Sequence, residues 1–198
     1  MAGRLPKVTA ETWVETARQM LIEDGVAEIK IDRLAQRLGV TRGGFYHYFV
    51  DRDNLLAQLL NLWDTSCKFL PPEPSGHTFM DGGRWIIRTI NRLIEEDGYD
   101  SAFDMAVREW ARSDQRTAWA VERADRQRLS TLEAILKILG HSTEEARIRA
   151  RVFYFHQIGF YALGIRESIP QRRQNSQLYT DILFGAELMR RVRAEQNE

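Results

Sequence analysis

Two helical patterns in the segment 31–48 are each only about two turns long. Gly39 ends the first pattern, and Thr41 can cap the second, which reaches Tyr48. Helices this short are marginal in isolation, so both must pack against a longer neighbour. The first pattern places its apolar residues on one face: Ile31, Leu34, Ala35 and Leu38. Two short helices joined across a glycine turn are typical of a helix–turn–helix unit.

The longer neighbour is predicted over residues 10–24, where Thr9 can cap the start and Gly25 follows the end. Its apolar face contains Trp13, Ala17, Met20 and Leu21. A fourth helix is expected from Asp51 to about Lys68, before the proline-rich stretch 71–76. We therefore predict a helix–turn–helix domain at 1–50, a connecting helix at 51–70 and a second domain at 71–198.

The second domain is also predicted to be helical. Ser142 and Glu145 have the spacing of a capping box, which is the clearest helix start in this half. The expected helices cover roughly 78–97, 101–112, 114–139, 143–166 and 175–194. Since no strand-like alternation occurs, the predicted fold class is all-α: a three-helix unit followed by a helical bundle, with about nine helices in total.

Composition excludes several classes of protein. Lysine plus arginine and aspartate plus glutamate both total 28, so the chain cannot coat nucleic acid through bulk positive charge. No apolar run is long enough for a membrane helix, and Cys67 has no second cysteine, so we expect a cytoplasmic protein that does not bind membranes. The histidines and glycines match no metal, nucleophile or phosphate-loop motif, so we predict no enzyme activity, catalytic residue, metal or cofactor.

The second short helix carries side chains suited to DNA. In helix–turn–helix proteins this helix lies in the major groove, where an arginine such as Arg42 can donate two hydrogen bonds to guanine. Gly43 and Gly44 are poor helix formers, and a close approach of the backbone to the groove is one reason to keep them. Phe45 and Phe49, four residues apart, are predicted to point inward.

These residues belong to a longer pattern. Residues 10–63 resemble the DNA-binding domain of the TetR family of bacterial transcriptional regulators, and the contiguous segment from Ile31 to Leu56 carries most of the resemblance. The segments 107–111 and 146–150 also resemble one branch of that family. The resemblance implies DNA contacts by the following residues: Lys30, Thr41, Arg42, Gly43, Gly44, Tyr46, His47, Tyr48 and Arg52. Lys30 and Gly44 depart from the usual family residues, which weakens a helix cap and removes one possible base contact.

The resemblance further implies a homodimer that binds a roughly palindromic double-stranded DNA operator, where it would join the nucleoid. A small, largely apolar or aromatic effector in the second domain would release this repressor. Candidate effector contacts are Trp63, Trp85, Trp110, Phe153, His156, Gln157 and Phe160. Core packing is the alternative for each aromatic residue, and internal hydrogen bonding is the alternative for His156 and Gln157. Candidate dimer contacts are Phe155, Ile158, Ala162, Leu178, Ile182, Gly185 and Met189.

Two other functions stay open at this point. The chain is alternatively an all-α small-molecule carrier or enzyme whose helix–turn–helix is a scaffold, or an activator of the same family. Local charge favours DNA binding, because the stretch 30–52 has more cations than anions. The cations are Lys30, Arg33, Arg37, Arg42 and Arg52, against Asp32 and Asp51. Arg4 and Lys7 are candidates for an arm that reaches DNA, with a disordered terminus as the alternative.

Overall fold

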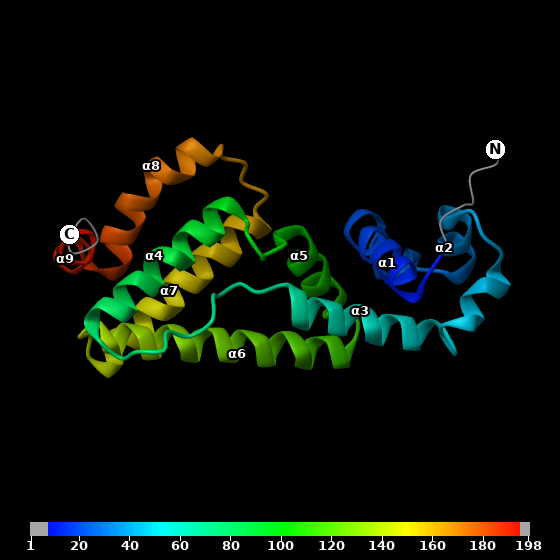
Figure 1. Ribbon diagram of the computed structural model, residues 1–198, viewed down its shortest axis with the longest axis horizontal. Helices are drawn as coiled ribbons and strands as arrows, with labels where there is room; N and C mark the ends of the chain where they lie inside the picture. The colour runs from blue at the N-terminus through cyan, green and yellow to red at the C-terminus, as the bar shows by residue number, and fades with distance from the viewer. Residues whose placement is uncertain (1–7, 195–198) are drawn as a thin grey trace. The chain divides into compact units, whose positions relative to one another are not determined.

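The computed structural model describes residues 8–194, so the expected arm at Arg4 and Lys7 lies outside the described residues. Within that range the fold is all-helical, as predicted, with nine α-helices and no strand (Figure 1). No described helix is long and apolar enough to cross a membrane. The helices are α1 Ala10–Asp24, α2 Ile31–Leu38, α3 Arg52–Ser66, α4 Phe79–Glu95, α5 Ser101–Trp110, α6 Gln115–Ile138, α7 Thr143–Ala162, α8 Ile169–Thr180 and α9 Ala186–Ala194.

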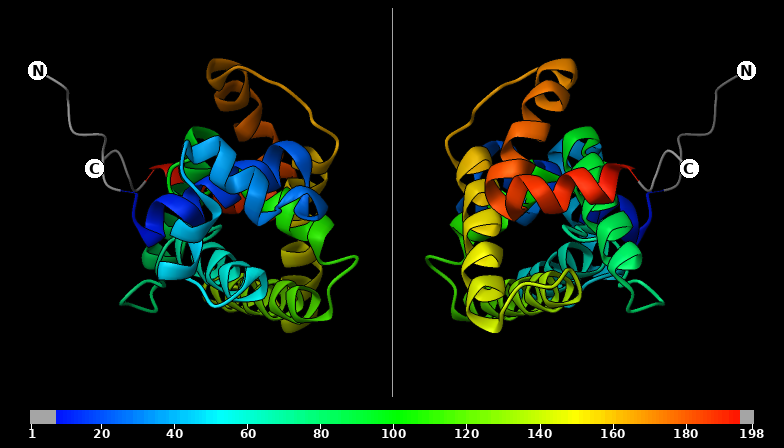
Figure 2. Two further views of the ribbon diagram at one scale, coloured as in Figure 1. Left: turned by 90° about the vertical axis from the view of Figure 1, so that its right-hand side faces the viewer. Right: turned by 90° about the vertical axis from the view of Figure 1, so that its left-hand side faces the viewer.

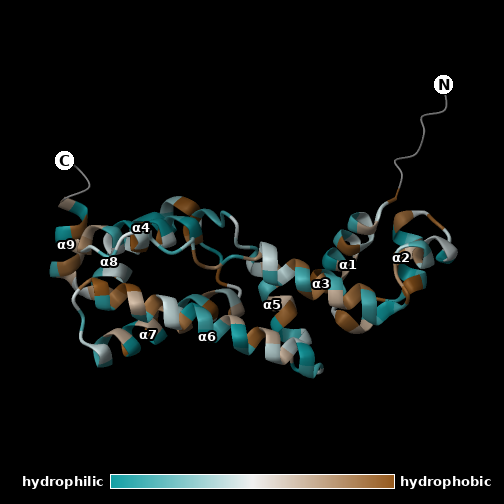
Figure 3. Ribbon diagram, turned by 60° about the horizontal axis from the view of Figure 1, so that its bottom comes forward, coloured by the Kyte–Doolittle hydropathy of each residue, from teal (hydrophilic) through white to brown (hydrophobic). Residues whose placement is uncertain are grey.

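Local capping signals explain where several helices begin and end. The Thr9 hydroxyl accepts a hydrogen bond from the Thr12 amide, so α1 begins at the predicted residue. Gly25 follows its end with φ +82°, a backbone conformation that favours glycine. The predicted capping box of Ser142 and Glu145 opens α7. Hydrophobic and hydrophilic residues share most helices, as expected for amphipathic segments that bury one face (Figure 3).

The chain divides into two compact units. The first contains the described residues up to Cys67 together with 102–121, and the second contains 68–101 and 122–194. The predicted boundary near residue 70 did not assign 102–121 to the N-terminal part. In the first unit the buried Asp104 of α5 accepts a 2.9 Å hydrogen bond from the Trp63 indole of α3. This tertiary contact is one reason why a segment distant in sequence joins the N-terminal helices.

The N-terminal helices share an aromatic core. The rings of Trp13 and Phe45 pack edge to face with centroids 5.4 Å apart, and Phe49 stacks on Phe45 at 5.1 Å. All three side chains are at most 2% exposed. Phe45 and Phe49 therefore point inward, as the sequence indicates, and Phe45 connects the segment Arg42–His47 to α1.

The C-terminal helices differ from the prediction. Instead of one helix over 175–194, α8 begins at Ile169, where Ser168 is the N-cap. A π-helical segment, Asp181–Gly185, separates α8 from α9, and Gly185 has φ +101°. The two helices consequently meet at an angle (Figure 1, Figure 2). The predicted helix 143–166 also ends earlier, at Ala162.

Candidate nucleic-acid interface and effector cavity

The recognition segment Arg42–His47 is a 3₁₀ helix rather than the predicted α-helix. Its two adjacent glycines disfavour a regular α-helix, and 3₁₀ geometry is common in short pieces of this length. The buried Phe45 holds the segment against the core. The other side of the segment faces solvent: Thr41, Arg42, Gly43, Tyr46, His47 and Tyr48 are exposed, and Gly44 is half-buried.

The Arg42 side chain is exposed, and two hydrogen bonds within the protein fix its orientation. Its guanidinium donates a 3.2 Å hydrogen bond to the Tyr46 hydroxyl and a 3.4 Å hydrogen bond to the Asp32 carboxylate. The hydrogen bond to Tyr46 and then the charge of Asp32 raise the pKa of Arg42 above its usual value. The side chain is still 58% exposed, so it stays available to an external acceptor.

Two of the candidate contacts have internal partners. Arg52 donates hydrogen bonds to the carbonyls of Ile29 at 2.6 Å and Val26 at 2.7 Å. The Tyr48 hydroxyl donates to the Val8 carbonyl at 2.7 Å. Arg52 is thus engaged with the 3₁₀ turn after α1 rather than standing as a free cation. Sequence reasoning missed this role because the acceptors are backbone carbonyls 23 and 26 residues away.

The positive charge around the recognition segment is largely compensated. Arg33 pairs with Glu28 and, at 3.4 Å, with Asp24, and Arg37 pairs with Glu23. Lys30 lies 3.5 Å from the Glu28 carboxylate. These acids lie at or just after the end of α1. They are therefore outside the stretch 30–52, whose excess of cations favoured the prediction of DNA binding. The unit therefore offers a few positioned donors rather than a continuous basic surface.

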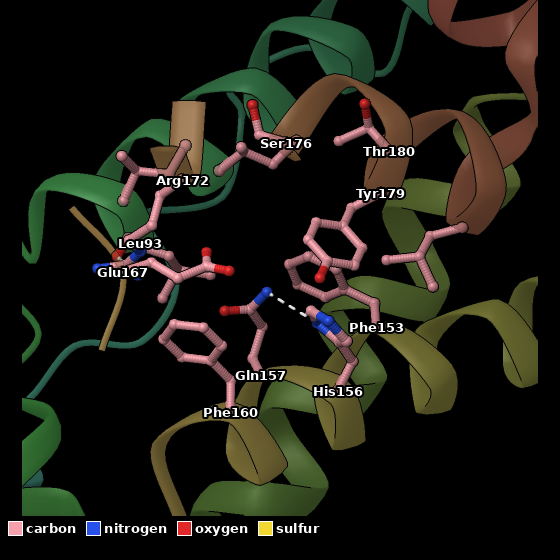
Figure 4. Close-up of a pocket in the computed structure, with 13 residues that line it drawn as sticks. Leu93, Phe153, His156, Gln157, Phe160, Glu167, Arg172, Ser176, Tyr179 and Thr180 are labelled. Atoms are coloured by element: carbon pink, nitrogen blue, oxygen red, sulfur yellow. Dashed lines mark hydrogen bonds between the residues drawn. The ribbon is translucent and has the colours of Figure 1, made fainter. Parts of the chain in front are cut away.

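The second unit contains a cavity of about 50 Å³ under α8 (Figure 4). Four predicted effector contacts on α7 line it together: Phe153, His156, Gln157 and Phe160. Its other lining residues come from α4, the loop after α7, α8 and the π segment: Ile90, Leu93, Ile94, Glu167, Arg172, Ser176, Tyr179, Thr180 and Leu183. None of the six lining residues after 162 was predicted as an effector contact, and the predicted helices 143–166 and 175–194 left Glu167 and Arg172 outside any helix.

The three tryptophan candidates lie elsewhere. The Trp63 indole bonds Asp104 in the first unit, and the Trp85 indole donates a 2.9 Å hydrogen bond to the Pro72 carbonyl in the second. Trp110 is 6% exposed and lines a groove of the first unit between α1 and α5. A buried indole needs an acceptor for its N–H, and this requirement draws Trp63 and Trp85 into structural contacts.

The polar side chains of the cavity interact with one another. Nε2 of Gln157 lies 3.2 Å from Nδ1 of His156, whose ring lies 4.7 Å from that of Tyr179. Burial lowers the pKa of His156, and the charge of Glu167 partly opposes that shift. His156 is therefore neutral at pH 7 and offers one nitrogen as an acceptor.

An apolar stripe runs along the outside of α7, α8 and the π segment. Phe155 is 60% exposed, Leu178 is 68% exposed and Ile182 is 75% exposed. Ala162 is exposed, whereas Ile158 and Gly185 are half-buried. The exposed Ile148 and Val152 extend the stripe at helical spacing and were not predicted. Met189 is 1% exposed, so its assignment to the dimer surface is wrong. The π segment changes the helical phase, which turns Met189 into the core.

Comparisons with known proteins agree with this geometry. Residues 14–59 match the family model described as bacterial regulatory proteins, tetR family. A stretch of 51 residues is 35% identical to the transposon Tn10 TetC protein of Escherichia coli, and this match spans 26% of each chain. The chain thus matches about a quarter of the length of that curated relative. The family that this model describes is one of regulatory proteins.

One solved structure shows the same fold over most of the chain. A transcriptional regulator from Rhodococcus sp. Rha1 has a TM-score of 0.56 at 18% identity, with 91% of this chain and 94% of that chain covered. BioQ, crystallised with its natural double-stranded DNA operator, has a TM-score of 0.44 at 17% identity, with 92% of this chain and 99% of that chain covered.

Proposed function

We propose that this chain is a DNA-binding regulator with a TetR-family DNA-binding domain, and that it is a repressor released by a small molecule. It would act in the bacterial cytoplasm as a homodimer on a roughly palindromic double-stranded DNA operator. The observation that carries the proposal is the recognition segment, where the exposed Arg42, Tyr46 and His47 surround the buried anchor Phe45. A symmetric dimer would present two such segments to two half-sites.

The cavity supports the effector part of the proposal. Ligand cavities usually measure several hundred Å³, so a ligand of ordinary size must displace the helix above a cavity of about 50 Å³. Among the twelve residues of α8 only Thr180 is buried, so little apolar contact opposes such a movement. A ligand that binds the displaced form more tightly shifts the population toward it.

A titration of the protein against DNA that flanks its own gene tests the proposal. Fluorescence anisotropy at several salt concentrations should show a saturable complex that an unrelated duplex of equal length does not compete away. A reporter under the flanking promoter should rise when the gene is deleted. A fall would indicate an activator, and no binding at low salt would indicate that the helix–turn–helix is a scaffold.

The Arg42→Ala variant is expected to bind its operator roughly 5- to 150-fold more weakly, the range for one lost bidentate guanine contact. Arg42→Lys is the matched control, because it keeps the charge but cannot donate two parallel hydrogen bonds. Competition against single-base operator variants measures the base preference. If Arg42→Ala keeps both affinity and preference, Arg42 does not read a base.

The Phe155→Glu variant is expected to weaken dimerisation by roughly two orders of magnitude, because it places an unpaired charge in the proposed apolar interface. Operator affinity should fall with it, since one protomer holds only one half-site. Sedimentation velocity over a concentration series measures the dimer. Gln127→Glu, an exposed change on α6 and therefore on neither helix of the stripe, is the control. An unchanged dimer in Phe155→Glu would place the interface elsewhere.

A further inference from the structure

We infer that the cavity under α8 selects an effector with a positively charged nitrogen attached to an aromatic or aliphatic body. This inference rests on the proposed effector role of the cavity and adds the chemical class of the ligand. It follows from three features of the lining: the aromatic walls, a carboxylate without a cationic partner, and an arginine whose charge is already balanced.

Aromatic and aliphatic side chains form most of the cavity wall. Phe153 and Phe160 reach it from α7, Tyr179 from α8, and Leu93 from α4 (Figure 4). An apolar ligand body gains free energy by burial against such a wall. The electron-rich faces of aromatic rings also attract a cation, which they favour over an anion.

Glu167 provides the negative charge. It lies in the loop after α7, and its carboxylate accepts one long hydrogen bond, at 3.4 Å, from the Asn175 side chain. Among residues 8–194, no lysine, arginine or histidine nitrogen lies within 4.0 Å of it. A half-buried carboxylate without a cationic partner favours a ligand that brings one.

Arg172 is the cation of the cavity, and its guanidinium already has hydrogen-bond partners within the protein. Its guanidinium donates to the Leu93 carbonyl, to the Tyr161 hydroxyl at 3.2 Å and to Glu96 at 3.2 Å. It also lies 5.2 Å from the centroid of the Phe160 ring. Glu96 balances its charge, so an anionic ligand would have to break this set of contacts. With His156 neutral, the remaining charge is that of Glu167.

Three soluble probes of similar shape and different charge test the inference: 2-phenylethylammonium, 2-phenylethanol and 3-phenylpropanoate. Ligand-detected NMR titration of the full chain at pH 7 gives a dissociation constant for each. We expect the ammonium to bind about tenfold or more tightly than the alcohol, and the carboxylate to bind most weakly. Glu167→Gln should bring the ammonium to the level of the alcohol. Glu187→Gln, an exposed carboxylate on α9 outside the cavity, should keep the preference.

Several outcomes would overturn the inference: tightest binding of the carboxylate, equal affinities for all three probes, no binding of the ammonium, or a preference that survives Glu167→Gln. Circular dichroism of each variant confirms that it is folded. A failure of the proposed function would be visible in a different measurement. It would appear as absence of operator binding without any probe, and that binding does not depend on the charge of the effector. If the alcohol binds and releases DNA as well as the ammonium does, the cavity is an effector site without charge selection.

Discussion

Operator binding is expected to be lost in the Phe45→Ala variant, although the Phe45 side chain is 0% exposed and cannot touch DNA. Truncation of a buried phenylalanine typically lowers the free energy of unfolding by about 3–5 kcal/mol. Here it also removes the edge-to-face contact with Trp13 and the stacking on Phe49. Because Phe45 lies in the middle of the recognition segment, its loss releases the segment that carries Arg42 and Tyr46.

Denaturant unfolding followed by circular dichroism measures the stability, and operator anisotropy measures the function. Tyr46→Ala is a matched control for the stability measurement, because Tyr46 is the next residue and 50% exposed. It should change the free energy of unfolding by less than about 0.5 kcal/mol, the usual range for surface substitutions. Equal losses of stability in the two variants would show that Phe45 does not anchor the segment.

The Asp104→Ala variant is expected to destabilise the first unit by about 3–5 kcal/mol, the usual cost of removing one member of a buried ion pair. Asp104 is 0% exposed, accepts the Trp63 indole N–H and receives a 2.8 Å hydrogen bond from Arg108, whose side chain is 17% exposed. Alanine would leave both donors without this carboxylate and would loosen α5 from α3.

Thermal unfolding followed by tryptophan fluorescence suits this variant, because the Trp63 indole loses its hydrogen bond to Asp104. Glu109→Ala is the control on the same helix, since its ion pair with Arg112 is largely exposed and worth little. A melting temperature for Asp104→Ala equal to that of the control would show that the buried pair does not hold α5.

The predicted helix boundaries were most accurate where a capping residue marks the end of the helix. Thr9 and Ser142 cap helices that begin where expected, because a cap links residues only three apart. The C-terminal prediction was wrong because the Ser168 cap was overlooked and because periodicity continues across the π segment as if the helix were regular.

The hydrophobic periodicity of the sequence could not predict the roles of Arg52, Met189 and Glu167. Arg52 finds its acceptors in the turn after α1, and Met189 enters the core after a change of helical phase. Glu167 lies in a loop and reaches the cavity because α8 folds back over α7. Each role depends on partners that only the folded chain brings near.

The amino-acid sequence by itself determined the all-α class, the ends of α1 and the inward direction of Phe45 and Phe49. These features rest on interactions between residues three or four apart along the chain, which a periodic pattern records directly. The tertiary structure alone decided that Arg52 is engaged by backbone, that Asp104 joins α5 to α3 and that Glu167 lines the cavity with Asn175 as a hydrogen-bond donor. Those outcomes depend on which distant groups packing brings within hydrogen-bond distance, and packing is a property of the whole fold.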